Sequence, residues 1–181
     1  EPLEELALAY AVERFGMSRG TMRSGLEIAK GGDFVYEDGD WRPAPFEVFR
    51  AGFDFPEPIG RQTMARYPSG EVITVPRHTR TKRVVSMVTA RTIAPHPSLA
   101  PVLPYTMPAL ALTLRTPLRG LLNTAIGALP EGPAEAQRRK AEFTVVAVAR
   151  DENGSERRGV VRGSDVYRLT AVTLVHGAEL T

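Results

Sequence analysis

The sequence predicts an α+β fold whose mixed, largely antiparallel sheet carries helices on one face. Three observations lead to this fold class. Several short segments alternate between apolar and polar residues, which is the period of a β-strand. The turn dipeptides Asp38-Gly39 and Asn153-Gly154 stand between such segments and are typical of β-hairpins. Segments with helical spacing follow N-cap residues elsewhere, and the 181 residues suffice for one domain, residues 1–181.

Composition narrows the class of protein. The chain has no cysteine, which excludes disulfides, zinc–thiolate sites and a cysteine nucleophile and is compatible with a cytoplasmic location, the one we expect. Its 23 basic and 21 acidic residues nearly balance. Almost all basic residues are arginines, which indicates either anion binding or, the reading we favour, the codon bias of a GC-rich genome. The arginines are scattered among acids, so we expect no nucleic-acid binding.

The first two elements are predicted to be a strand and a helix. Residues 6–12 alternate leucine, tyrosine and valine with alanine, which favours a buried strand, although a helix over 2–15 fits the pattern as well. Ser18 or Thr21 can cap a helix that runs to about Lys30, where Gly31-Gly32 would end it.

This helix start provides the first candidate site. Its N-terminus, with Arg19 and Thr21, could hold an anionic group. The alternative is an ordinary cap beside a solvated arginine.

The central part of the sequence reads as strands. Segments 34–36 and 41–42 flank Asp38-Gly39 and predict a hairpin. Segment 46–55 alternates loosely and predicts a strand with a bulge at Gly52. Segment 61–75 predicts a second hairpin around Pro68-Ser69-Gly70, which Pro76 would end, and segment 83–90 predicts a further strand.

Polar side chains at the end of the second hairpin form another candidate site. Arg77 and His78 would follow a strand directly, a position where a histidine could polarise or protonate a carbonyl group. Tyr67, just before the turn, could bind the same ligand. The alternative for His78 is a hydrogen-bonded structural role, and for Tyr67 it is packing.

Residues 92–114 contain no formally charged residue, but five prolines interrupt them, so we predict no transmembrane span. We predict instead two short helices that start at Pro108 and Pro117 and are capped by Thr106 and Thr116. Their shared apolar face comprises Leu110, Leu114, Leu118, Leu121, Leu122 and Ala125. We expect this face to pack in the core, the alternative being an exposed binding or dimer surface in the segment 92–129.

The C-terminal part predicts a polar loop over 129–140, a hairpin of 143–150 with 157–162, and a final helix capped by Gly163-Ser164-Asp165. Apolar residues lie on much of that helix, so we expect it to be well buried. No signal peptide is visible. The chain starts without methionine and stops inside a helical pattern, so we expect a longer protein truncated at both ends.

Several enzymatic motifs are missing. No glycine-rich dinucleotide loop, P-loop, H-E-x-x-H or G-x-S-x-G occurs in the sequence. The three histidines, His78, His96 and His176, are far apart and have no carboxylate at ligand spacing, so we expect no metal site.

The order of several local motifs resembles the C-terminal part of saccharopine dehydrogenase-like oxidoreductases, in the branch with trans-acting enoyl reductases. The motifs that carry the resemblance are Ser18-Arg-Gly-Thr21 with Ser24-Gly-Leu-Glu27, Tyr36-Glu-Asp-Gly39 with Trp41-Arg-Pro43, Pro68-Ser-Gly-Glu71 with Pro76-Arg-His-Thr79, and Phe143-Thr-Val-Val146 with Gly163-Ser-Asp-Val-Tyr-Arg-Leu-Thr-Ala171.

The resemblance implies that this chain is the second, α+β domain of an NAD(P)-dependent oxidoreductase. In that family, an N-terminal Rossmann domain holds the cofactor and the second domain covers the cofactor cleft and helps to form a dimer. The resemblance therefore implies no cofactor contact within this chain, NAD(P) in the full-length protein, a homodimer, and a small-molecule or lipid-like substrate. No catalytic residue of the family maps onto this sequence.

Overall fold

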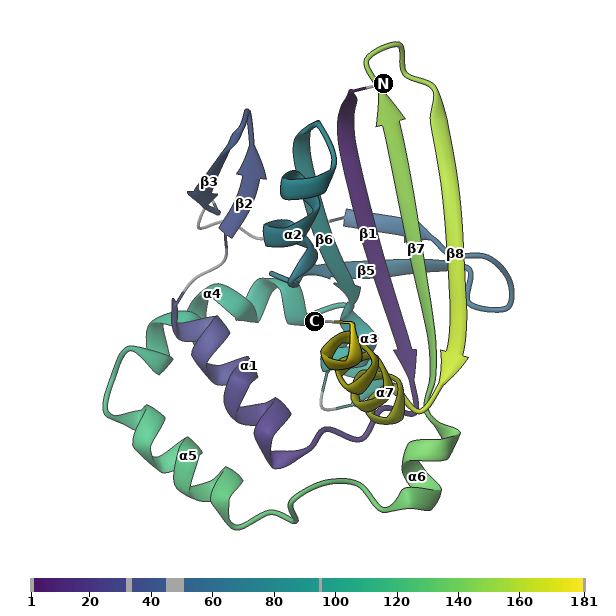
Figure 1. The fold of residues 1–181 in the computed structure, drawn as a ribbon. Helices are drawn as coiled ribbons and strands as arrows, with labels where there is room; N and C mark the ends of the chain where they lie inside the picture. Colours follow the sequence, from purple (N-terminus) through teal and green to yellow (C-terminus); the bar gives the residue numbers. More distant parts are fainter. Residues whose placement is uncertain (1, 32–33, 45–50, 95, 181) are drawn as a thin grey trace.

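A computed structural model describes residues 2–31, 34–44, 51–94 and 96–180 (Figure 1). The described residues form eight strands and seven helices, so the α+β class is confirmed. The elements in chain order are β1 (Leu3–Glu13), α1 (Arg19–Gly31), β2 (Phe34–Glu37), β3 (Asp40–Pro43), β4 (Ala51–Asp54), β5 (Arg61–Arg66), α2 (Glu71–His78), β6 (Thr81–Thr89), α3 (Ala90–Ile93), α4 (Leu103–Leu114), α5 (Leu118–Gly127), α6 (Glu135–Lys140), β7 (Glu142–Asp151), β8 (Glu156–Ser164) and α7 (Val166–Glu179).

All eight described strands belong to one sheet. Six of them lie side by side in the order β3-β2-β6-β1-β7-β8, and β4 and β5 branch from β6. Beyond the short β2 pairing, β6 also pairs with β5, which in turn pairs with β4. The neighbours β1 and β6 run parallel, and the other pairings among the described strands are antiparallel. The alternating segment at the start of the chain is therefore the central strand of the sheet, and the alternative helix over 2–15 is not formed.

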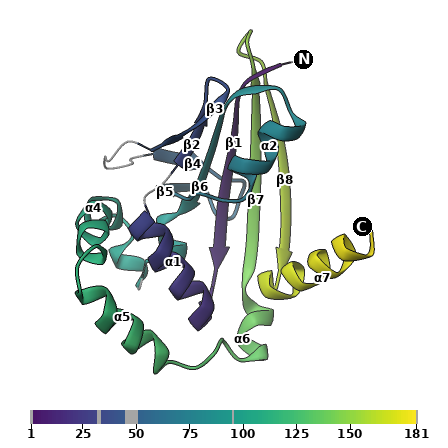
Figure 2. The ribbon, with the colours of Figure 1, turned by 60° about the vertical axis from the view of Figure 1, so that its left-hand side comes forward.

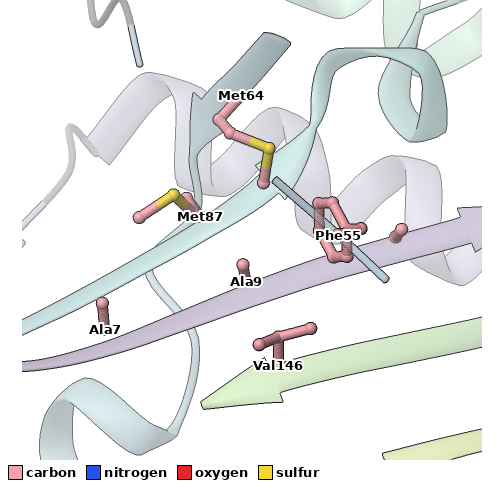
Figure 3. Packing of buried hydrophobic residues seen from close by; sticks show 7 residues of the cluster. Ala7, Ala9, Phe55, Met64, Met87 and Val146 are labelled. Carbon is pink, nitrogen blue, oxygen red and sulfur yellow. The ribbon is translucent and has the colours of Figure 1, made fainter. Parts of the chain in front are cut away.

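The alanines of β1 define one face of the sheet, the alanine face (Ala7, Ala9 and Ala11). Phe55, which follows β4, and Met64 of β5 pack on these alanines (Figure 3). Because alanine side chains are small, the β4–β5 hairpin can cross this face closely, as Figure 1 shows behind β1 and β7. Beyond β7, the guanidinium of Arg162 in β8 donates to the Glu57 carbonyl of the same hairpin at 2.7 Å.

Helix α2 covers the opposite face of the sheet. We call it the tyrosine face, because it carries Tyr10, together with Leu8, of β1. Val72 of α2 is almost fully buried there against Leu8 and Val84. The strand predicted over 71–75 is therefore wrong. The alternating run 71–75 is also compatible with a helix, because positions 72 and 75 lie on the same side of a helix. Burial of that side against the sheet favours the helix over the strand.

The proline inside α2 explains why Trp41 lies against this helix. Pro76 has no N–H group to donate to the Val72 carbonyl four residues earlier. The indole Nε1 of Trp41 in β3 donates to that carbonyl instead, at 3.0 Å. The ring of Trp41 also meets Tyr36 edge-on, with 5.2 Å between the ring centroids. A hydrogen bond from the neighbouring hairpin thus replaces the one that the proline removes.

Local turn and cap chemistry produces the other hairpins and two helix starts. Asp38 and Gly39 both have positive φ, 52° and 88°, and join β2 to β3 as predicted. The hairpin of β7 and β8 is also confirmed. Ser18 Oγ accepts a hydrogen bond from the Thr21 N–H, and Asp165 Oδ1 accepts one from the Arg168 N–H, so both predicted caps are present.

Other predictions for the strands and loops were wrong or lie outside the described residues. Gly52 pairs with Thr63 without a shift in register, so it forms no bulge. Residues 46–50 and Gly32 lie outside the described residues. The predicted loop 129–140 contains helix α6, whose Glu135 and Arg139 form an ion pair across one turn at 2.6 Å.

The apolar segment after β6 forms short helices. Helix α4 starts at Leu103, five residues before the predicted start at Pro108, and the Thr106 hydroxyl donates to the Leu103 carbonyl instead of capping. Helix α5 starts at Leu118, one residue after the predicted start, and its N-cap is Pro117 rather than Thr116. The Thr116 hydroxyl oxygen still accepts a hydrogen bond from the Leu118 N–H. In the described part of the chain, no helix combines the length and apolarity that a membrane span requires.

Two helices expose apolar residues that the sequence analysis assigned to the core. Leu114 of α4 is buried, but Leu118, Leu121 and Leu122 of α5 are exposed. Helix α7, all of which is described, has no buried side chain, and its leucines and valines at 169, 172, 174 and 175 are exposed. The prediction that α7 is well buried is therefore wrong. Figure 2 shows α7 projecting away from the sheet.

Candidate functional site

A cluster of tyrosine, serine and glutamate side chains, which we call the tyrosine–glutamate cluster, lies on the tyrosine face, where α2 begins. Tyr10 comes from the central strand β1, Tyr67 and Ser69 from the connection between β5 and α2, and Glu71 is the first residue of α2. The parallel register pairs Leu8 with Ser86 and Tyr10 with Val88, and the Tyr67 N–H donates to the Ser86 carbonyl at 3.1 Å. Strand pairing therefore brings Tyr67 next to Tyr10.

The two tyrosine rings are in contact. Their centroids are 5.8 Å apart and the ring planes make an angle of 77°, an edge-to-face arrangement. Tyr67 is 39% exposed, whereas Tyr10 is half-buried and Ser69 is buried. Tyr67 is therefore the member of the cluster that a ligand approaching the sheet would meet first.

The carboxyl group of Glu71 is held in its charged form. Burial alone would raise its pKa, but hydrogen bonding by the Ser69 and Tyr10 hydroxyls and by its own backbone outweighs burial and lowers the pKa of Glu71 below 4.5. The Ser69 hydroxyl, although close enough to affect Glu71, does not reach full hydrogen-bond geometry with any described residue. A carboxylate in the first turn of α2 also suits the positive end of that helix.

Both tyrosines remain protonated at neutral pH. Burial raises the pKa of Tyr10 above 10.0, and the hydrogen bond to Glu71 and the charge of Glu71 raise it further. Burial also raises the pKa of Tyr67, and the charge of Glu71 adds to that effect. The cluster consequently offers neutral hydroxyl donors around one carboxylate, which suits hydrogen bonding to a polar group of a ligand.

Two buried serine hydroxyl groups, Ser69 in the cluster and Ser86 in strand β6, have unused hydrogen-bonding capacity. Ser69 and Ser86 are 6% and 4% exposed, and their Oγ atoms have no hydrogen-bond partner within the described ranges. A buried polar group without a partner is uncommon and often marks a position for water or a ligand. These hydroxyls are therefore a reason to consider the cluster a binding site.

The predicted residues Arg19 and Thr21 lie elsewhere, at the start of α1. The guanidinium of Arg19 donates to the Gly127 carbonyl at 3.1 Å and pairs with Glu131 at 3.2 Å. The Thr21 hydroxyl lies 3.2 Å from the Tyr167 hydroxyl, which donates in turn to a carbonyl in the β1–α1 connection. Arg19 and Thr21 thus connect α1 to the α5–α6 loop and to α7.

The predicted residues Arg77 and His78 do not follow a strand. They occupy the last turn of α2, where the positive charge of Arg77 suits the negative end of the helix, and both are exposed. Arg77 lies six positions after Glu71 in the helix, which corresponds to about 9 Å along the axis. The structure therefore places only Tyr67, of the five predicted residues, in the tyrosine–glutamate cluster.

Sequence analysis did not select Tyr10, Glu71 or Ser86 as site residues. Tyr10 carried the one available signal, because its hydroxyl is the one polar side-chain group among residues 6–12, which are otherwise alanine, leucine and valine. The contribution of Ser86 depends on the pairing of β6 with β1 and gives no signal in the sequence.

A cavity of about 530 Å³ lies at the carboxyl ends of the parallel strands β1 and β6, a common ligand position in α/β sheets. Ala11 and Ile59 line it, so it is on the alanine face and the sheet separates it from the tyrosine–glutamate cluster. The charged side chains that line the cavity include Arg14, whose guanidinium forms an ion pair with the Glu142 carboxylate at 2.6 Å. The cavity is therefore a second, separate place for a small polar ligand.

No group of three potential metal-ligating side chains occurs within the described residues. Comparison of the chain with models of known protein families and with curated proteins found no match.

Proposed function

We propose that this chain is the substrate-side domain of a longer NAD(P)-dependent oxidoreductase of the saccharopine dehydrogenase-like type. Two observations support the proposal: the order of motifs described above, and an α+β fold of the kind that the resemblance implies. The tyrosine–glutamate cluster is the observation on which the substrate role rests. In this proposal the protein is cytoplasmic and its substrate is a small or lipid-like molecule.

The residues of this chain do not fit the dinucleotide itself. In a dinucleotide-binding fold, the turn between the first strand and helix is glycine-rich and approaches the pyrophosphate closely. Here a side chain added at Gly16 in that turn would come within 2.8 Å of Gln137 and Pro133, so protein atoms already occupy the space. We therefore assign the cofactor to a separate N-terminal Rossmann domain and derive no step from it.

In the proposed site, the hydroxyl of Tyr67, which is the exposed tyrosine of the cluster, donates a hydrogen bond to a carbonyl oxygen of the substrate. Tyr10 contacts the Tyr67 ring and hydrogen-bonds to Glu71, so these two residues position Tyr67. The domain contributes orientation of the substrate and exclusion of water, two effects that raise the rate of a transfer between bound groups.

Leu169 and Val172, two exposed apolar residues of α7, support a homodimer as part of this proposal. Leu169 and Val172 lie beside Phe143 and Val161 of the β7–β8 hairpin, around a shallow cavity of about 680 Å³. Charged side chains, Arg139, Arg162 and Arg168 among them, line the same cavity, and exposed apolar side chains beside charged ones are common in protein–protein contacts. Multi-angle light scattering should show a dimer, and Val172→Asp should give a folded monomer; a monomeric unsubstituted chain would contradict the dimer alone.

The test of the proposed function uses the full-length protein and this chain in parallel. Fluorescence titration with NADPH should show binding to the full-length protein and none to this chain. With a substrate identified for the full-length protein, Tyr67→Phe should lower kcat/KM at least tenfold, because the phenyl ring keeps the packing and loses the donor. A full-length protein that does not bind either nicotinamide cofactor would refute the proposal.

A second candidate function is an interaction module that holds a lipid or a partner through the apolar segment 92–129. The exposed leucines of α5 are the specific observation that favours it. The two functions are compatible, since a domain that handles a lipid-like substrate also benefits from a lipid contact.

A further inference from the structure

Helix α5 turns its apolar side outward. Leu118, Leu121, Leu122 and Ala125 have the spacing of one helix face, and all four are exposed. Arg119, Asn123 and Ile126 on the other side are half-buried, and Arg119 forms an ion pair with Glu27 of α1. This arrangement is the reverse of an amphipathic helix that packs on its own domain, so the leucines are available to another surface.

Helix α4, which contacts α5, also has exposed apolar residues. Tyr105 and Leu112, and Val102 just before the helix, are each more than half exposed. Helices α4 and α5 contact each other and α1, and Figure 2 shows them together at the edge of the molecule opposite α7. We define the leucine surface as the exposed residues of α4 and α5 with the adjoining Val102, namely Val102, Tyr105, Leu112, Leu118, Leu121 and Leu122.

The net charge near the leucine surface is positive. From Thr92 to Pro130, the formally charged residues are Arg115 and Arg119 alone. The three helices α1, α4 and α5 contain four basic residues and one acidic residue, a formal charge of +3, compared with +2 for the whole chain. An apolar surface with neighbouring arginines complements an anionic phospholipid surface, because leucine enters the acyl boundary and arginine meets the headgroups.

We propose that the leucine surface binds the surface of an anionic phospholipid bilayer. The contact is peripheral, because α4 and α5 have 12 and 10 residues, whereas a spanning helix needs about 20. This proposal rests on the second candidate function and makes it specific: the ligand is a bilayer surface with negative headgroups. A bilayer contact would explain why α5 directs leucines rather than Arg119 and Asn123 to the outside.

The experiment is co-sedimentation of the chain with phosphatidylcholine vesicles, with and without phosphatidylserine. We expect binding to the vesicles that contain phosphatidylserine and weaker binding as sodium chloride screens the charges. Leu121→Asp should lower the partition coefficient about tenfold or more, since a leucine is no longer buried in lipid. Arg115→Gln should weaken binding only to the anionic vesicles.

Leu174→Asp is the matched control, because Leu174 of α7 and Leu121 of α5 are both 69% exposed. It should leave vesicle binding unchanged, and circular dichroism should show both variants folded. Absence of vesicle binding, or equal loss in both variants, would overturn the proposal. Self-association that Leu121→Asp abolishes, without vesicle binding, would assign the surface to a second copy and also overturn it. NADPH binding by the full-length protein should be the same with Leu121→Asp, so the two proposals fail separately.

Discussion

The hydrogen bond between Trp41 and the Val72 carbonyl gives a prediction that can be worked out in full. Trp41→Phe removes the donor and keeps most of the aromatic contact with Tyr36. The Val72 carbonyl then has no donor, since Pro76 cannot supply one. A lost hydrogen bond that leaves a partly buried acceptor without a partner costs about 1 to 2 kcal/mol of unfolding free energy.

A double-mutant cycle with Pro76→Ala isolates this effect. Alanine at position 76 restores the N–H group that an α-helix directs at the carbonyl four residues earlier. In that background, Trp41→Phe should cost less, by about 1 kcal/mol, than in the unsubstituted chain. Urea unfolding of the four proteins measures the difference. Equal costs of Trp41→Phe in the two backgrounds would refute the explanation that the indole replaces the missing proline donor.

Three further predictions concern β8 and the tyrosine–glutamate cluster. Gly163→Ala should lower the free energy of unfolding by about 1 to 3 kcal/mol, because the added Cβ would lie 2.5 Å from the Phe143 ring. Gly159→Ala in the same strand is the control in urea unfolding, since its added Cβ meets no atom within 4 Å. The raised pKa of Tyr10 contributes stability that is present below pH 10 and lost as the pH rises above it, so Tyr10→Phe should flatten the alkaline loss of stability. The lowered pKa of Glu71 contributes stability that is present above pH 4.5 and lost as the pH falls, so Glu71→Gln should reduce the acid dependence of unfolding; unchanged pH profiles would contradict both assignments.

Local chemistry was sufficient to predict the hairpins, the caps and the central strand. Asp38-Gly39 adopts positive φ because a two-residue hairpin turn requires it, whatever surrounds the hairpin. Ser18 and Asp165 cap helices because their side chains reach N–H groups three residues ahead. These features depend on residues close in sequence and could therefore be read from it.

The candidate site was predictable only in part. Tyr67 was selected because it precedes a turn, and the structure places it in the cluster. Tyr10 and Ser86 come from strands that pair only in the folded chain, so the register of β1 with β6 had to be known before they could be placed beside Tyr67. Arg77 and His78 were assigned to a strand end because the run before Pro76 fits both periodicities.

The sequence by itself determined which residues are apolar and which of them share a face of an element, because that follows from the period of the backbone. It did not determine what each face contacts. The leucines of α5 and α7 have the same pattern as a core-facing helix, yet they are exposed, while the alanines of β1 lie under a hairpin from 50 residues later in the chain. Only the tertiary structure decided these contacts, since burial depends on how segments distant in the sequence fill the space around each other.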